Sequence, residues 1–233
     1  MKNGVFIDVG SNTGQTLIEL RSVDENIVYY GFEPNPTCVS YCINLIKVNK
    51  FSKSYIIPVG VFSENKVLNI HLTSETDSSG TIIEDLRPGY PVIERYLIPV
   101  MTFESIQKTV NIDDISIVKI DVEGSELEVF RSLEFTITKY KPIILCEILW
   151  AHNEDKLSYV SENNSKIIDL VHKMGYEIYR LIKSEDNNDV KSLENVKGIE
   201  KYVYSSSNSD LCDYIMIHQD YIEKVRELFP SNI

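Results

Sequence analysis

An acid followed by a turn that two glycines bracket opens this chain, in a pattern that suits a nucleoside ligand. Asp8 lies in an apolar run, residues 5–9, and a helical pattern follows the turn. The turn consists of Gly10, Ser11, Asn12, Thr13 and Gly14. Glycine permits a close backbone approach, and the unpaired N–H groups at a helix start suit an anionic group. Such a turn at the carboxyl end of the first strand of an α/β sheet is typical of a nucleotide site.

A second acid, Glu33, follows the next apolar run, residues 28–32. An acid at this place in an α/β sheet binds ribose hydroxyls. Pro34, Asn35 and Pro36 come next and predict a turn and a helix start. The first turn lacks the Gly-x-Gly-x-x-Gly spacing that cradles a pyrophosphate. The sequence therefore favours a nucleoside cofactor without a pyrophosphate over a dinucleotide.

More acids gather at the ends of two later apolar runs. These are Asp121, Glu123, Glu126 and Glu147. Like charges in a shared site raise at least one pKa, which can supply a base near neutral pH. Glu126 has a second interpretation, as a first-turn acid that interacts with the helix dipole. Glu147 is expected at the same edge of the sheet, in contact with substrate or cofactor.

His152 follows the fifth predicted strand and is the best placed of the four histidines to act as a general base. The alternative is a loop histidine that only packs near Trp150. Carboxylates with one histidine can also bind a divalent metal. Nothing in the spacing fixes a ligand set, so we predict no metal site.

The elements that position these residues alternate between apolar runs and helical patterns, which predicts parallel strands joined by crossover helices. Strands are expected at residues 5–9, 28–32, 55–59, 117–120, 142–148, 176–181 and 214–218. Helices are expected at residues 14–21, from 36, from 125, 165–174 and 221–229. A hairpin pairs residues 67–72 with 99–102. Residues 73–96 between its strands are interpreted as a long functional loop, with a disordered excursion as the alternative, and residues 183–210 as a polar insertion.

Length and charge limit the classes of function. The 233 residues suit a single domain over residues 1–233. A formal net charge of −12 argues against nucleic acid as a partner and favours a small neutral or cationic one. No apolar run is long enough to span a membrane, and a cytoplasmic location is expected, with the four cysteines reduced. The sequence leaves open whether the chain forms a homo-oligomer.

Three motifs in order carry a family resemblance. They are DVGSNTG at residues 8–14, EPNP at 33–36 and KIDVEGSE at 119–126, followed by CEI at 146–148. Together they resemble the FkbM family of S-adenosylmethionine-dependent methyltransferases over residues 5–148. The resemblance implies an α/β, Rossmann-like class I methyltransferase fold: a mostly parallel central sheet flanked by helices, with an antiparallel last strand and an inserted β-hairpin.

The resemblance also implies a cofactor site and a reaction. S-adenosyl-L-methionine would be bound by Asp8, Gly10, Ser11, Asn12, Thr13, Gly14, Glu33, Pro34, Asn35, Gly60, Val61, Asp121 and Glu123. Asp121, Glu147 and His152 are the candidate catalytic residues for in-line transfer to a small-molecule or saccharide acceptor, with a hydroxyl of a saccharide or secondary metabolite expected. The alternatives are a catalytically silent cofactor-binding module and an NAD-linked oxidoreductase or epimerase.

Overall fold

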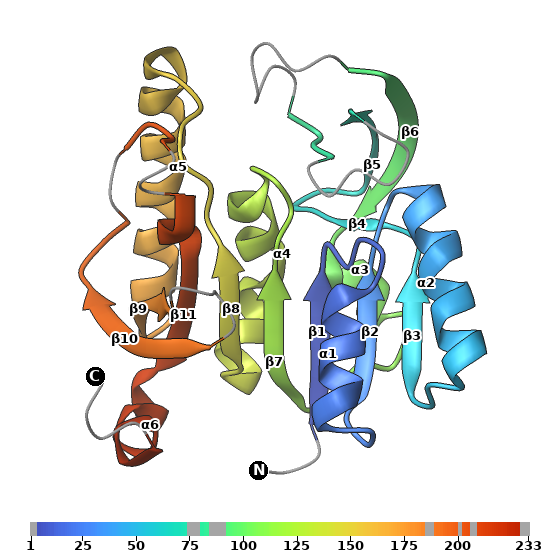
Figure 1. Ribbon diagram of the computed structural model, residues 1–233, viewed down its shortest axis with the longest axis horizontal. Coiled ribbons are helices and arrows are strands. Elements are labelled where there is room, and N and C mark those ends of the chain that lie inside the picture. The colour runs from blue at the N-terminus through green and yellow to red at the C-terminus, as the bar shows by residue number, and fades with distance from the viewer. Residues whose placement is uncertain are drawn as a thin grey trace.

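An eight-stranded sheet in the order β10-β9-β11-β8-β7-β1-β2-β3 forms the centre of the computed structural model (Figure 1). The structure describes residues 4–73, 80–83, 92–184, 189–199, 202–205 and 209–228. The strands of this sheet are β1 (Val5–Val9), β2 (Val28–Phe32), β3 (Ser54–Ile57), β7 (Ile115–Ile120), β8 (Ile143–Glu147), β9 (Tyr176–Lys183), β10 (Val190–Val196) and β11 (Asp213–His218).

The strand directions confirm the predicted fold class. β3, β2, β1, β7 and β8 are parallel neighbours, and β11 is antiparallel to both β8 and β9. Every residue of β1 is buried, as expected for a central strand that helices cover on both faces. The carboxyl ends of β1, β2 and β7 therefore meet at one edge of the sheet.

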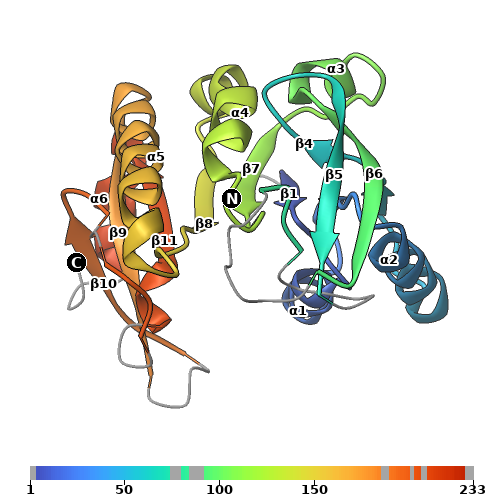
Figure 2. The ribbon, with the colours of Figure 1, turned by 90° about the horizontal axis from the view of Figure 1, so that it is seen from above.

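Helices cover both faces of the sheet. The helices are α1 (Gln15–Val23), α2 (Pro36–Asn49), α3 (Phe103–Gln107), α4 (Glu126–Tyr140), α5 (Glu154–Lys173) and α6 (Ile222–Leu228), with 3₁₀ turns at Ser209–Cys212 and Gln219–Tyr221. Seen from above, α3, α4 and α5 lie on one side of the sheet and α1 on the other (Figure 2). Alternation along β1 explains this arrangement. Ile7 and Val9 join the core under α4, whereas Phe6 packs with Leu17 of α1.

The predicted hairpin is present and belongs to a second, three-stranded sheet in the order β4-β6-β5. Its strands are β4 (Gly60–Val61), β5 (Lys66–Leu72) and β6 (Glu94–Met101). β6 begins earlier than predicted because Glu94 and Tyr96 pair with Leu72 and Ile70. Residues 94–96 therefore belong to the hairpin and not to the long loop. Residues 74–79 and 84–91 of that loop lie outside the described part of the chain.

One prediction along the second half of the chain is wrong, and one segment has structure that was not predicted. The helix expected at residues 165–174 begins at Glu154, where the Asn153 side chain accepts a hydrogen bond from Lys156 N at 3.1 Å. Ser161 and Asn164 on its buried face obscured the apolar period. The polar insertion contains β10, an edge strand on which Leu193 is buried.

Candidate active site

A cavity of about 370 Å³ opens where the carboxyl ends of β1, β2 and β7 meet the three-stranded sheet. Ten of the residues predicted to bind the cofactor line it, including Asp121, which was also predicted to be catalytic. These residues are Gly10, Ser11, Asn12, Glu33, Pro34, Asn35, Gly60, Val61, Asp121 and Glu123. A volume in this range suits a cofactor-sized ligand. The structure thus brings these residues from four separate segments of the sequence to one place.

The glycines of the first turn are required by close neighbours. Gly10 has φ +87°, and a Cβ there would lie 1.8 Å from the Asp121 carbonyl oxygen. Gly14 has φ +89°, and a Cβ there would lie 2.9 Å from Leu45 Cδ2 of α2. A Cβ at Gly10 would thus first meet the backbone after β7, and a Cβ at Gly14 would first meet a side chain of α2.

The backbone N–H groups of the turn are already used within the chain. Gly10 N and Ser11 N donate to Phe32 O, and Asn12 N donates to Glu33 Oε2. Gly14 N donates to Ser11 O. The first turn of α1 follows, and within the described residues no backbone acceptor is assigned to the N–H groups of Gln15 and Thr16. Both residues line the cavity, so the N–H groups at the start of α1 are the donors that can reach an anionic group there.

Glu33 is held in place by the backbone around it. Its Oε2 accepts from Asn12 N and its Oε1 from Asn35 N, both at 2.8 Å. The side chain lines the cavity although the residue is only 6% exposed. Burial raises the pKa of Glu33 to about 7, against the opposing effect of the two N–H donors. A carboxylate has about four acceptor positions, so two remain for hydroxyl groups.

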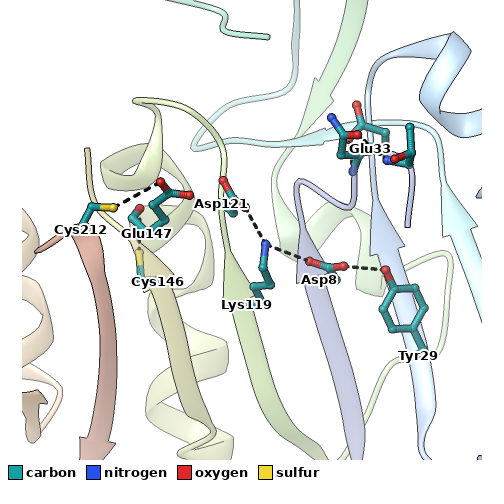
Figure 3. A network of polar contacts seen from close by, with 10 residues as sticks. Asp8, Tyr29, Glu33, Lys119, Asp121, Cys146, Glu147 and Cys212 are labelled. Carbon is teal, nitrogen blue, oxygen red and sulfur yellow. Dashed lines mark hydrogen bonds and ion pairs between the residues drawn. The ribbon is translucent and has the colours of Figure 1, made fainter. Parts of the chain in front are cut away.

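Asp8 lies beneath the cavity and not in its wall. The residue is fully buried, and the Tyr29 hydroxyl donates to its Oδ2 at 2.6 Å (Figure 3). Lys119 Nζ lies 3.8 Å from Asp8 Oδ1 and 2.8 Å from Asp121 Oδ2. Burial raises the pKa of Asp8 to about 6, although the Lys119 charge and the Tyr29 hydrogen bond oppose this. Lys119, which also lines the cavity, therefore lies between two predicted site residues.

Glu147 lies next to Asp121, because Cys146 pairs with Ile120 in the sheet (Figure 3). Burial and the charges of Asp121 and Asp213 raise the pKa of Glu147 to about 7. The Cys212 thiol donates to Glu147 Oε1 at 3.5 Å. Glu147 is not among the residues that line the 370 Å³ cavity, but it is adjacent to one that does.

Glu126 has the structural role that was the second interpretation of this residue. It begins α4, is buried, and its Oε1 accepts from Gly124 N at 2.8 Å. Burial raises the pKa of Glu126 to about 7, against these backbone hydrogen bonds. It does not line the 370 Å³ cavity. The carboxyl group therefore orders the loop between β7 and α4.

Thr13, Gly14 and His152 are not among the residues that line the cavity. Thr13 and Gly14 complete the turn, and His152 lies in a bend beside Ala151, which pairs with Val203. In the part of the chain that the structure describes, no group of three or more His, Cys, Asp or Glu side chains is arranged to hold a metal ion. No helix among the described residues is long and apolar enough to cross a membrane.

The sequence analysis missed several lining residues. They are Gln15, Thr16, Glu19, Phe62, Ile70, Ile82, Ile98, Val100 and Lys119. Lys119 carries a signal that could have found it, because it is the one charged residue in the mostly apolar strand β7. The apolar residues of the hairpin carry no such signal, since they also read as ordinary core positions.

Comparison with known proteins places this arrangement in a family. The FkbM methyltransferase domain matches residues 8–178, which is most of the chain and contains every residue of the candidate site. This chain belongs to the FkbM methyltransferase family. No curated protein matches it over its sequence.

Solved structures agree on the fold of this FkbM family member. An FkbM methyltransferase from Methylobacillus flagellatus KT has a TM-score of 0.52 at 14% identity, over 93% of this chain and 44% of the other. A protein from Staphylococcus aureus, provisionally assigned as a caffeoyl-CoA O-methyltransferase, has a TM-score of 0.50 at 12% identity, over 92% of this chain and 76% of the other. The chain thus spans less than half of the first of these structures, and identities this low speak for the fold alone.

Proposed function

We propose that this protein is an S-adenosylmethionine-dependent methyltransferase that methylates a hydroxyl group of a saccharide or secondary metabolite. The observation that carries the proposal is the cavity between Glu33 and Asp121, with the turn at Gly10 between them. Family membership gives the class of reaction. The donors and acceptors that line the cavity match the chemical groups of this cofactor.

Each chemical group of the cofactor has a counterpart among the residues that line the cavity. Glu33 has two free acceptor positions for ribose hydroxyls, and the N–H groups of Gln15 and Thr16 suit a carboxylate. The apolar side chains of Val61, Phe62 and Val100 form a wall against which the adenine ring can pack. The lining contains four acids, Glu19, Glu33, Asp121 and Glu123, and one cation, Lys119. This excess of acids over cations among the described lining residues favours a ligand that carries an ammonium and a sulfonium.

Asp8 takes a different role in this proposal from the one predicted. Because the residue is fully buried and does not line the cavity, it holds Lys119 and Tyr29 in place instead of contacting the cofactor. Lys119 in turn fixes the carboxylate of Asp121. These successive contacts orient the Asp121 side of the cavity.

Methyl transfer to a hydroxyl group needs the hydroxyl oxygen in line with the C–S bond of the cofactor. It also needs a base that takes the hydroxyl proton. When bound, S-adenosylmethionine supplies a methyl group whose C–S bond breaks as the acceptor oxygen forms the new C–O bond, leaving the electron pair on a neutral thioether. We assign the hydroxyl proton to Glu147, whose pKa of about 7 suits a general base, with Asp121 between it and the cavity. A hydroxyl group has a proton that such a base can remove, so a base at this position favours a hydroxyl as the methyl acceptor.

Ligand-dependent melting tests the proposal. A ligand at 100 times its dissociation constant stabilises the folded state by about 2.7 kcal/mol. We expect S-adenosylhomocysteine and S-adenosylmethionine to raise the melting temperature and NAD⁺ to leave it unchanged. Release of S-adenosylhomocysteine in the presence of glycans separates an active enzyme from a silent binding module. Stabilisation by NAD⁺ alone would contradict the proposal.

A further inference from the structure

A second hollow of about 440 Å³ adjoins the cofactor cavity, and the described residues of its lining include more cations than acids. The two share Phe62, Ile82 and Ser125 in their walls. The second hollow lies between the β5–β6 hairpin, the start of α4 and the middle of α5, and Figure 2 shows α4 between α5 and that hairpin. We call it the α4–α5 hollow.

Three cations from three different elements line the α4–α5 hollow. Lys66 comes from β5, Arg131 from α4 and Lys166 from α5. Among the described residues, its lining holds two acids, Glu64 and Glu128, while Glu162, which is not in the lining, pairs with Lys166. The cofactor cavity has one cation and four acids. In a chain with a net charge of −12, this local reversal makes the hollow the more favourable of the two spaces for an anionic group.

The three cations remain available to a ligand. Lys66 Nζ is 3.7 Å from Glu64, and Lys166 Nζ is 2.6 Å from Glu162. The cationic side chains of these pairs and of Arg131 are 36–46% exposed. Exposed ion pairs of this kind contribute only about 0–1 kcal/mol each. A bound anion can therefore replace or share these partners at little cost.

Arg131 is the most firmly oriented of the three. Its Nη1 donates to Glu128 Oε1 at 2.6 Å, while Glu128 Oε2 accepts from the Ser63 hydroxyl. Glu128 thus connects α4 to the segment before β5 and fixes the direction of the guanidinium group. An arginine has five N–H donors, so most of them remain for a ligand. A planar donor group of this kind suits a carboxylate or a phosphate.

Polar and aromatic groups complete the lining. Tyr159, which is 46% exposed, and Asn163 both come from α5 and lie in the wall of the hollow. An aromatic ring with a hydroxyl and a side-chain amide are groups that bind the faces and hydroxyls of sugars. Together with the cations, they suit a polyhydroxylated ligand that carries a negative charge.

We propose that the α4–α5 hollow binds the methyl acceptor, and that this acceptor carries a carboxylate or phosphate group beside its hydroxyls. This inference rests on the proposed methyltransferase function and specifies its substrate class. The cationic cofactor occupies the acidic cavity and the anionic acceptor the basic hollow, with Phe62, Ile82 and Ser125 between them. The preference for a neutral or cationic partner, inferred from net charge alone, is thereby reversed for this site.

A phosphate titration followed by NMR tests the binding site. Inorganic phosphate added to the S-adenosylhomocysteine-loaded protein should shift the backbone amide signals of Gly124, Ser125 and Arg131. Arg131→Gln and Lys166→Gln should each weaken this binding by about two- to fivefold, the effect of losing one exposed charge pair. Lys108→Gln is the matched control, because Lys108 forms an exposed pair with Glu104 at 2.8 Å outside the hollow. Absence of shifts at the hollow, or equal weakening in the control, would overturn the inference.

A second arm identifies the anionic group and separates this inference from the proposed function. Turnover is compared for glycans that end in glucuronate, in glucose 6-phosphate and in glucose. We expect one charged glycan to be methylated in preference to the neutral one, with Arg131→Gln raising its KM and leaving kcat and cofactor affinity unchanged. Preferred turnover of the neutral glycan would overturn the acceptor assignment alone. Failure of S-adenosylhomocysteine to bind would instead overturn the proposed function, while phosphate binding stays measurable without it.

Discussion

The ammonium group of Lys119 lies 2.8 Å from the carboxylate of Asp121, and both side chains line the candidate cofactor cavity. Lys119 also approaches the fully buried Asp8 at 3.8 Å. Although burial opposes its charge, the two carboxylates hold the pKa of Lys119 above its ordinary value. One cation therefore stabilises two acids, one beneath the cavity and one in its wall.

Lys119→Met should destabilise the protein and weaken cofactor binding. We expect a loss of about 1.5–3 kcal/mol in the free energy of unfolding, the range for hydrogen bonds to charged groups, measured by urea denaturation. Lys108→Met serves as the control, because its pair with Glu104 is exposed. Equal losses in both variants would show that Lys119 has no special role.

Tyr29→Phe tests the second partner of Asp8. Removing the hydroxyl leaves Asp8 Oδ2 without its 2.6 Å donor inside the sheet, which should cost about 1–3 kcal/mol of stability. Tyr140→Phe removes a hydrogen bond of the same length, 2.6 Å, which the Tyr140 hydroxyl donates to Asp113 at an exposed position. Urea denaturation should show a much smaller loss for that variant. Similar losses of stability in the two variants would contradict the expectation that a buried hydrogen bond contributes more than an exposed one.

Gly10→Ala should disrupt the site more than an ordinary glycine substitution. The φ of +87° and the 1.8 Å approach of a Cβ to the Asp121 carbonyl require the backbone to move, and strain of this kind costs about 1–3 kcal/mol. At Gly198, where a Cβ would meet Ile168 Cδ1 at 3.5 Å, alanine should be tolerated. Melting temperature and S-adenosylhomocysteine affinity should fall for Gly10→Ala only. An unaffected affinity would show that the turn does not shape the cavity.

The backbone framework of the site could be predicted from the sequence. The strands at residues 5–9 and 28–32 have the predicted bounds because short apolar runs end in recognisable turn residues. Glu33 and Asp121 follow from the rule that parallel strand ends share an edge of the sheet. The contact between Tyr29 and Asp8 could not be predicted, since it depends on side chains that cross between neighbouring strands.

The apolar walls of the cavity and the α4–α5 hollow could not be predicted from the sequence either. Phe62 and Ile82 reach the cavity because the β5–β6 hairpin folds over the sheet edge, which no local pattern specifies. The cations of the α4–α5 hollow are far apart in sequence and meet only through the packing of α4 beside α5 (Figure 2). Net charge, a sum over the whole chain, conceals such a local reversal.

Glu147→Gln tests the assignment of the general base. Because a base acts in its deprotonated form and the pKa of Glu147 is raised to about 7, kcat should increase with pH through about 7 and level off above it. The Gln variant should lose this limb and about 10²–10⁴ of kcat, with cofactor affinity retained. A pH–rate profile unchanged by the substitution would exclude Glu147. His152→Gln, measured alongside, tests the other predicted base.

The central claim concerns where the cofactor lies, and a crystal structure with S-adenosylhomocysteine tests it most directly. The account predicts the nucleoside in the 370 Å³ cavity, with its ribose hydroxyls hydrogen-bonded to Glu33 and its carboxylate near the N–H groups of Gln15 and Thr16. Density for the ligand outside that cavity, or a Glu33 side chain turned away from the ribose, would contradict it.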